Sequence, residues 1–270
     1  MRIIFLGDVV GAPGRQGVVR TIPRIREERS PDLIVANGEN IKHGSGITEE
    51  LYRALRAAGV DGVTLGDHAL RDRRIVPTLE RADEPITIPF NLPARSPGQR
   101  ILKLAPAAGS WQGTGVAVVT VLGRVFMNGP SDEPFGAIDR ALERCPAAPG
   151  MARPIVIVEA HMEATAEKIA LAHYLDGRVT AVVGSHTHVP TADARLLPRG
   201  TAFITDMGMC GPYDSVIGRD KEAVVTHMSA GLPTQFDVAS GDVRVCGCQI
   251  DLDPLTGRAV AIERVEWGVG

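Results

Sequence analysis

The pattern of hydrophobic and polar positions predicts strands that alternate with helices. Short apolar runs at residues 2–6, 33–36 and 60–65 are rich in β-branched side chains, and each leads into a glycine and then into polar residues. Residues 15–29 and 48–58 lie between these runs and carry apolar side chains at the spacing of an amphipathic helix. We therefore expect an α/β fold whose strands present polar side chains at a sheet edge.

The rest of the chain continues this alternation. Further strands are expected at residues 85–88, 100–104, 115–121, 154–158, 179–183 and 202–205, and further helices at 73–81, 134–144, 163–175 and 221–228. Residues 233–239, 242–252 and 257–267 are separated by glycine turns and predict antiparallel strands. The glycine-rich segment 206–212 is expected to form a loop that closes over a site.

Composition and charge limit the class of protein. The chain has 270 residues, of which 44% are hydrophobic and 23% charged, and this length suits a single domain spanning residues 1–270. The net charge of −3 and the scattered basic residues argue against polymeric nucleic acid as a partner. The first apolar run stops at Gly7, too soon for a signal peptide, and no run is long enough to span a bilayer. We expect a cytoplasmic protein without a membrane partner.

The four cysteines, Cys145, Cys210, Cys246 and Cys248, show no CxxC spacing. Cys246 and Cys248 flank one glycine in a strand-like segment, which is one arrangement that binds a soft metal. Small, reduced core residues are the more common role of such cysteines. We assign the cysteines no function.

Two histidines directly follow the apolar run at 179–183. His186 and His188 are two residues apart in the stretch Gly-Ser-His-Thr-His-Val-Pro. Because alternate residues of an extended segment project to the same side, one metal ion or a close pair of ions can bind both imidazoles. The alternative is a pair of hydrogen-bonded loop histidines, and the spacing alone does not decide between them.

Other predicted strands end in side chains of the same kind. These side chains are Asp8, Glu39, Asn40, Asp67, His68 and His161. A single carboxylate such as Asp8 is equally consistent with a turn or a helix cap. Three successive strands with such ends, however, predict a shared site along one sheet edge.

Together with His186 and His188, this set offers carboxylate, carboxamide and imidazole donors. Such a mixture suits iron, manganese or zinc better than calcium. Seven or eight ligand-type side chains exceed what one tetrahedral ion needs, so two metal ions are the economical count. A carboxylate such as Glu39 can bridge them.

Five motifs follow one another along the chain. They are Gly-Asp-Val-Val-Gly at 7–11, Asn-Gly-Glu-Asn at 37–40, Gly-Asp-His at 66–68, His-Met-Glu-Ala-Thr-Ala-Glu-Lys at 161–168 and Gly-Ser-His-Thr-His at 184–188. In this order they resemble the YmdB-like metallophosphoesterases over nearly the whole chain. The resemblance implies a calcineurin-like, four-layer sandwich in which two stacked mixed β-sheets are flanked by helices. It also implies a dinuclear, often iron, site and hydrolysis of cyclic nucleotides, above all 2′,3′-cyclic ones.

The resemblance also implies a role for each site residue. One metal ion would be bound by Asp8, Glu39, Asn40 and His188, and the other by Glu39, Asp67, His161 and His186. His68 would be the proton donor. The chain departs from the family at one visible position, because Asp67 stands where the family usually has asparagine. This change adds a negative charge and removes an amide donor, which bears on metal preference and phosphate affinity.

The implied reaction is attack on phosphorus by water that the metal ions acidify, with His68 protonating the departing ribose oxygen. Departure of the 2′-oxygen gives a 3′-nucleotide. The same motifs are compatible with a phosphomonoesterase or a 3′,5′-cyclic phosphodiesterase, with a low-turnover regulatory protein that binds a cyclic nucleotide, and with a structural single-metal protein. They are also compatible with a homo-oligomer. Position in the chain makes His43, Asn91 and residues 207–213 candidates for the pocket wall.

Overall fold

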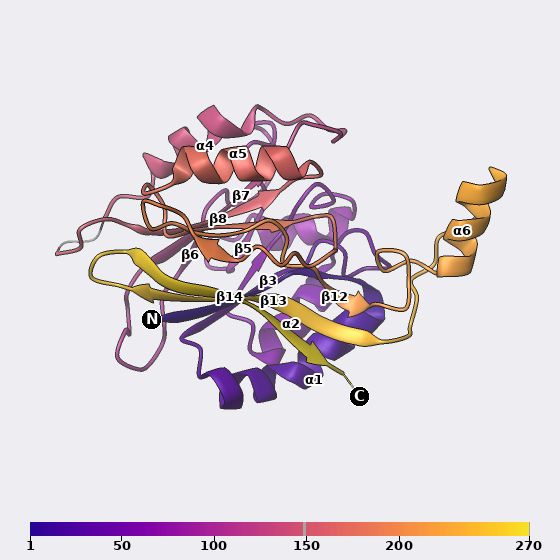
Figure 1. Cartoon of the computed structure of the whole chain (residues 1–270), viewed down its shortest axis with the longest axis horizontal. Coiled ribbons are helices and arrows are strands. Elements are labelled where there is room, and N and C mark those ends of the chain that lie inside the picture. The colour runs from indigo at the N-terminus through magenta and orange to yellow at the C-terminus, as the bar shows by residue number, and fades with distance from the viewer. Residues whose placement is uncertain (148–149, 270) are drawn as a thin grey trace.

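The computed structural model describes residues 1–147 and 150–269 and shows two mixed β-sheets stacked face to face (Figure 1). The first sheet has the order β2 (Asp8–Val9), β12 (Met209–Pro212), β13 (Val243–Asp253), β1 (Arg2–Leu6), β3 (Leu33–Asn37), β4 (Gly62–Thr64) and β5 (Ile86–Thr87), and β14 (Arg258–Gly268) also pairs with β13. The second has the order β10 (Arg195–Leu196), β11 (Ala202–Ile204), β9 (Ala181–Ser185), β8 (Ile155–His161), β7 (Val116–Leu122) and β6 (Leu102–Leu104).

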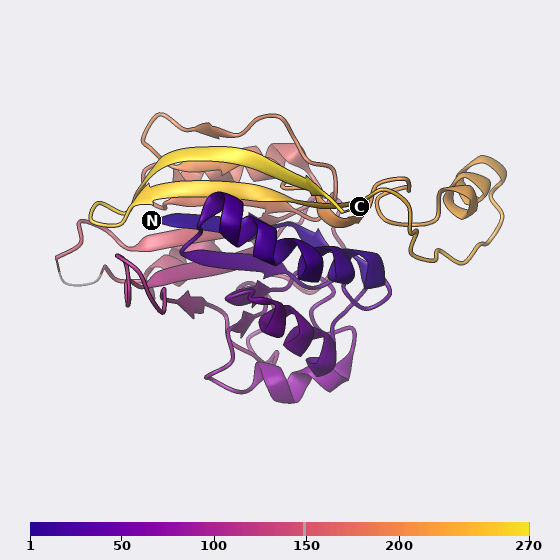
Figure 2. The same ribbon diagram turned by 90° about the horizontal axis from the view of Figure 1, so that it is seen from below.

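Helices cover the outer faces of both sheets. On the first sheet lie α1 (Gly11–Arg29), α2 (Glu49–Ala58), the 3-10 turn η1 (Arg73–Ile75) and α3 (Val76–Leu79). On the second lie α4 (Pro134–Leu142) and α5 (Thr165–Leu175). Figures 1 and 2 show α6 (Lys221–Ala230) extending away from the body of the molecule. In the part of the chain that is described, no helix is both long and apolar enough to cross a membrane.

The hydrophobic core has three layers, and β1 contributes to two of them. Ile4 and Leu6 face the layer under α1 and α2, whereas Ile3 and Phe5 face the second sheet. This alternation buries both faces of the strand, as expected for a strand within a sheet that is covered on both sides. A third layer lies between the second sheet and α4 and α5. The expected four-layer α/β architecture is therefore confirmed.

Parallel pairing brings the polar strand ends together. In the first sheet β1 pairs in parallel with β3 and β3 with β4, and in the second sheet β8 pairs in parallel with β9. Parallel neighbours end at the same edge of a sheet, where open α/β folds bind ligands. The motifs at residues 8, 39–40 and 67–68 therefore lie side by side, although long stretches of chain separate them.

Two expected elements are wrong. Segment 206–212 is not a loop over the site, because Met209–Pro212 forms the buried strand β12 between β2 and β13. Segment 233–239 is not a strand, since Val238 makes only an isolated bridge to Arg219. The first prediction relied on glycine content and the second on β-branched content. Whether each segment forms a strand depends instead on whether the fold offers it a neighbouring strand to pair with.

The structure also shows where helices α1 and α2 begin and where the cysteines lie. Helix α1 begins at Gly11 rather than at residue 15, since Pro13 is tolerated in a first helical turn. Thr48 caps α2, and its hydroxyl accepts a hydrogen bond from Leu51 N. The four cysteines are free and buried, which fits the core role expected for them.

Candidate metal centre

Four side chains from the two sheets converge at the carboxyl ends of their strands. Glu39 follows β3, Asp67 follows β4, His161 ends β8 and His186 follows β9. One ligand atom from each lies within 4.8 Å of the others. His161 Nε2 is 3.0 Å from Asp67 Oδ1 and 3.1 Å from both Glu39 Oε1 and His186 Nδ1. We call this group the four-residue cluster, and its convergent basic atoms are suited to hold a cation.

The other three predicted ligands border the four-residue cluster. Asp8 Oδ2 accepts a hydrogen bond of 3.1 Å from the backbone N–H of His186. Asn40 and His188 line a cavity of about 330 Å³ together with Glu39 and His186. The structure thus brings all seven predicted ligands to one edge of the sandwich, while their role as ligands stays a prediction.

Two buried oxygen atoms support a metal ion on the side of Asp8 and Asn40. Among the residues that the structure describes, Asp8 Oδ1 and Asn40 Oδ1 are buried and have no hydrogen-bond partner. A buried acceptor without a partner is costly, so each oxygen requires something to bind. Hard oxygen donors beside imidazole nitrogens fit iron, manganese or zinc.

Hydrogen bonds fix which nitrogen each histidine offers. The Ser185 hydroxyl donates to Glu159 Oε1 at 2.8 Å, so its oxygen is free to accept from His161 Nδ1 at 2.9 Å. His188 Nδ1 lies 2.9 Å from the carbonyl oxygen of Ile217, which can only accept. In both rings Nδ1 therefore carries a proton, and Nε2 is the nitrogen left for a metal ion, which would displace any proton bound there.

Glu159, which has no role in the prediction from sequence, is the centre of the hydrogen-bond network behind the site. This fully buried carboxylate accepts hydrogen bonds from Asn37 Nδ2 at 2.8 Å, from Thr120 Oγ1 at 2.7 Å and from Ser185. It thereby joins β3, β7 and β9 to its own strand, β8. One signal was available: a charged residue inside an apolar strand, two positions before His161, must point to the same side as that histidine.

The electrostatics of the centre show an excess of negative charge. Burial raises the pKa of Asp8 to about 7. Burial opposes the charged form of His161, but the carboxylates of Glu39, Asp67 and Asp8 raise the pKa of His161 well above its usual value. The imidazole in turn lowers the pKa values of Glu39 and Asp67 against the effect of their burial. Such a site gains stability from any added cation, whether proton or metal.

The backbone is strained at two of the predicted ligands, His186 and His188. His186 and His188 have φ angles of 91° and 64°, in the left-handed region that non-glycine residues rarely adopt. Gly66 is required beside the four-residue cluster, since a Cβ there would lie 2.3 Å from His161 Nε2 and 2.4 Å from Glu39 Oε2. Strain of this kind persists where the surrounding structure holds a functional geometry.

A buried ion pair holds the segment between the two histidines. Lys168 Nζ lies 2.7 Å from Asp206 Oδ2, and both side chains are fully buried. The same oxygen accepts hydrogen bonds from Thr187 N at 3.2 Å and Thr187 Oγ1 at 2.6 Å. Gly208 N donates to Asp206 Oδ1 at 2.7 Å. The pair therefore fixes Thr187, which stands between His186 and His188.

Comparison with known proteins decides the family. Residues 4–265 match the profile of a family described as YmdB-like protein. The chain belongs to this family.

One curated protein and two solved structures are similar to this YmdB-like chain. It is 41% identical to the 2′,3′-cyclic-nucleotide 2′-phosphodiesterase of Bacillus subtilis (strain 168), over 98% of this chain and 96% of that protein. A crystal structure of a novel phosphatase from Mycoplasma pneumoniae superposes with a TM-score of 0.88 at 29% identity, covering 99% of this chain and 93% of that one. The calcineurin-like phosphoesterase YfkN of Bacillus subtilis, with a TM-score of 0.58 at 16% identity over 99% and 90% of the two chains, shares the fold.

His68 lies beside the four-residue cluster on the wall of the same cavity. Its backbone N–H donates to Glu39 Oε2 at 3.0 Å, and its Nδ1 is 3.6 Å from Glu39 Oε1 and 3.3 Å from Asn40 Nδ2. Its Nε2 is 3.7 Å from Asp67 Oδ2. The Glu39 carboxylate raises the pKa of His68. The ring is therefore fixed through Nδ1, and Nε2 is left for a substrate.

Asp67 is the position where this YmdB-like chain departs from the residue expected of the family. Its Oδ1 is shared between His161 Nε2 and His186 Nδ1, at 3.0 and 3.5 Å. An asparagine oxygen could occupy the same place, so the geometry tolerates either residue. The carboxylate adds a third negative charge to those of Asp8 and Glu39.

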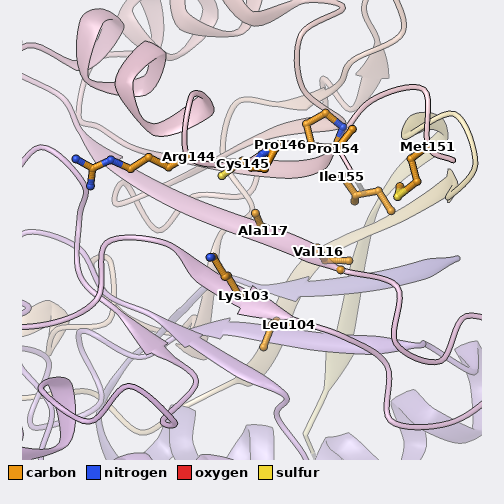
Figure 3. Close-up of a pocket in the computed structure, with 12 residues that line it drawn as sticks. Lys103, Leu104, Val116, Ala117, Arg144, Cys145, Pro146, Met151, Pro154 and Ile155 are labelled. Carbon is orange, nitrogen blue, oxygen red and sulfur yellow. The ribbon is translucent and has the colours of Figure 1, made fainter. Parts of the chain in front are cut away.

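A separate apolar cavity of about 410 Å³ lies far from the four-residue cluster (Figure 3). It is lined by the first residues of β7 and β8, including Val116 and Ile155, whereas the four-residue cluster lies at their other ends. Seven-residue strands such as these span roughly 20 Å. Lys103 and Arg144 stand at its rim without an acidic or imidazole partner among its described lining residues. We assign this cavity no part in the reaction.

The three candidates for the pocket wall differ in outcome. His43 is exposed and lines a second cavity rather than that of the metal centre. Asn91 is buried and instead bonds to the backbone of Leu122 and Asp132, at both ends of the loop after β7. Of residues 207–213, those from 207 to 212 are buried in and before β12, and Tyr213 directly after it is partly buried.

Proposed function

We propose that this YmdB-like protein is a metal-dependent phosphodiesterase that hydrolyses 2′,3′-cyclic nucleotides to 3′-nucleotides. The observation that carries the proposal is the convergence of the four-residue cluster and the unpaired oxygens of Asp8 and Asn40 beside one open cavity. The Bacillus subtilis relative is described as a 2′-phosphodiesterase acting on such nucleotides. Cleavage at the 2′-oxygen leaves the phosphate on the 3′-oxygen.

Seven residues are proposed as ligands for two metal ions. One ion takes Asp8, Glu39, Asn40 and His188, and the other takes Glu39, Asp67, His161 and His186. The mixed oxygen and nitrogen donors suit iron, manganese or zinc, and iron is proposed first because of the family resemblance. When bound, such ions supply Lewis acidity at the phosphoryl oxygens and lower the pKa of water toward 7.

His68 is proposed as the proton donor to the departing 2′-oxygen. Its Nδ1 faces Glu39 and Asn40, so Nε2 is the nitrogen that reaches the substrate. The Glu39 carboxylate raises the pKa of His68 and so favours the protonated ring. Water adds to phosphorus and releases one proton, the bond to the 2′-oxygen breaks, and the proton on Nε2 passes to that oxygen, which becomes a hydroxyl group of the ribose. The proton released from water restores the protonated His68.

The first experiment is turnover of 2′,3′-cyclic AMP by metal-loaded protein, with the product resolved as 3′-AMP or 2′-AMP. We expect 3′-AMP. Release of 2′-AMP would overturn the assignment of the leaving oxygen. Turnover of phosphomonoesters or 3′,5′-cyclic AMP without any of the 2′,3′-cyclic ester would replace the proposed activity by that alternative, and binding without turnover would support a regulatory role.

The donor role of His68 predicts a dependence on the leaving group. His68→Ala is expected to slow 2′,3′-cyclic AMP by roughly 10²- to 10⁴-fold, since an alkoxide is a poor leaving group. An aryl diester such as bis(p-nitrophenyl) phosphate should lose far less, because its phenolate departs without a proton. His173→Ala, at an exposed position of α5, is the matched control. Equal losses on both esters would remove His68 from this role.

We also propose that residues 1–270 form one domain. In support, the carboxyl-terminal strands β13 and β14 lie in the first sheet, where β13 pairs with β1 in antiparallel orientation. The partner proposed for this domain is a small phosphate ester rather than polymeric nucleic acid.

A further inference from the structure

A second cavity lies next to that of the metal centre and has a volume of about 480 Å³. It is lined by Ala12, Pro13, His43, Gln235, Phe236, Asp237 and Val238. None of these residues belongs to the proposed metal ligands. The lining combines an aromatic ring and an imidazole with apolar surface and with the polar side chains of Gln235 and Asp237.

The two cavities share a wall built around Arg219. Arg219 lines the cavity of the metal centre, and its Nη1 donates to the carbonyl oxygens of His43 at 2.9 Å and Phe236 at 3.0 Å. Its Nη2 donates to Gly44 O at 2.8 Å, and Gly44 also lines the first cavity. Neighbouring residues of one chain segment, His43 and Gly44, therefore line the two cavities, and Arg219 bonds to both of them.

The backbone of this wall is held in place. A Cβ at Gly44 would lie 2.6 Å from Arg219 Cζ, so only glycine allows the guanidinium to pack there. Ala239 N donates to Gly218 O at 3.0 Å, and Asp220 N donates to Asp237 O at 2.9 Å. The segment that directly follows Phe236 is therefore anchored to residues 218–220, although it is not a strand.

Phe236 presents its ring from this anchored segment. The Phe236 ring packs edge-to-face against the His227 ring of α6, with ring centroids 5.3 Å apart. Phe236 keeps 39% of its surface exposed. An aromatic ring held on a fixed backbone and open to a cavity is the surface on which a nucleobase stacks. His43 supplies a second flat ring on the same cavity.

We propose that the second cavity binds the nucleobase of the substrate, with Phe236 and His43 as the residues that recognise it. The inference rests on the proposed function, because it requires a cyclic nucleotide whose phosphate lies at the metal centre. In a 2′,3′-cyclic nucleotide the base on C1′ and the phosphate on O2′ and O3′ lie on opposite faces of the ribose ring, which matches a charged site beside an aromatic cavity. Gln235 and Asp237 offer hydrogen-bonding groups for the edge of the base.

A rival position exists on the other side of the metal centre. A cavity of about 180 Å³ is lined by Asp67, Arg71 and the loop from Gly123 to Ser131, whose Phe126 is 86% exposed. It has less than half the volume of the second cavity, and Phe126 itself is not among its lining residues. Phe126→Ala is therefore a matched aromatic control.

The test compares 2′,3′-cyclic AMP with a cyclic phosphodiester that lacks a base, glycerol 1,2-cyclic phosphate. Phe236→Leu is expected to lower the ratio of the two kcat/KM values by roughly 5- to 100-fold, mainly through KM for the nucleotide. Phe236→Tyr, which keeps the ring, should restore the ratio. His43→Asn should lower it as well, and asparagine tolerates the φ of 49° at this position.

Calorimetric binding of 3′-AMP, the proposed product, supplies a readout that does not depend on turnover. Phe236→Leu is expected to weaken this binding by a similar factor, with Phe126→Ala unchanged. An unchanged ratio and unchanged binding in both Phe236→Leu and His43→Asn would overturn the inference, as would losses confined to Phe126→Ala. If wild-type protein binds 3′-AMP through Phe236 yet turns over no 2′,3′-cyclic ester, the proposed function fails while the base site stands.

Discussion

Replacing Glu39 with glutamine is expected to lower kcat/KM on 2′,3′-cyclic AMP by at least about 10³-fold and to deplete the protein of metal. Glu39 is the one residue assigned to both ions, and its side chain is almost fully buried against His161. Glutamine keeps the size and an oxygen that can accept from His68 N, but it removes the charge. Loss of one preorganised electrostatic group typically costs 10²- to 10³-fold, and weakened metal binding adds to that loss.

Metal per chain, measured by mass spectrometry, and kcat/KM test this expectation together. Glu163→Gln is the matched control, because Glu163 lines the same cavity and lies 3.2 Å from His186 Nε2 but stands outside the four-residue cluster. It should retain metal and lose no more than about tenfold. Thermal unfolding of metal-free Glu39→Gln should also show a loss of stability, because the lowered pKa of Glu39 means that the folded protein favours its charge beside His161. Full metal content with activity within tenfold of wild type would contradict the assignment of Glu39.

Lys168→Met is expected to reduce the free energy of unfolding by about 3–5 kcal/mol. The substitution leaves the Asp206 carboxylate buried without its cation, and the hydrogen bonds from Thr187 and Gly208 replace only part of that interaction. Methionine fills nearly the same volume, so the loss reports the charge rather than a cavity. Because Asp206 holds Thr187, metal binding through the flanking histidines should weaken as well.

Denaturant unfolding of wild type, Lys168→Met, Asp206→Asn and the double variant measures this effect as a double-mutant cycle. We expect the double variant to be more stable than Lys168→Met, because removing both charges avoids an unpaired buried ion. Lys221→Met is a suitable control, since Lys221 pairs with Asp214 at 2.5 Å on an exposed surface and its loss should change stability far less than Lys168→Met does. A loss below 1 kcal/mol in Lys168→Met would show that the buried pair does not hold this segment.

Most of the metal centre was predictable because its residues follow strands whose apolar runs are visible. Asp8, Glu39 and Asp67 each come after such a run, and parallel pairing places the ends together. His161 and His186 could be added from the second sheet for the same reason. That the two sheets stack with these edges at one end came from the family resemblance rather than from periodicity.

Contacts between distant segments were not predictable in the same way. The charge of Glu159 within an apolar strand places it on the side of His161, but only the fold shows that Asn37, Thr120 and Ser185 converge on it. The wall at Phe236 depends on Arg219 reaching the carbonyl oxygens of His43 and Gly44 from another part of the chain. No local pattern marks such a pairing.

The sequence by itself determined the alternation of strands and helices, the kinds of donor atom at the strand ends and the family. These properties are local, since they depend on side-chain periodicity and on residues adjacent to each run. Only the tertiary structure decided that 209–212 is a strand rather than a loop, which nitrogen each histidine offers, and that an aromatic cavity adjoins the metal centre. Those properties depend on which groups the fold brings within a few ångströms of one another, and that proximity is set by the packing of the whole chain.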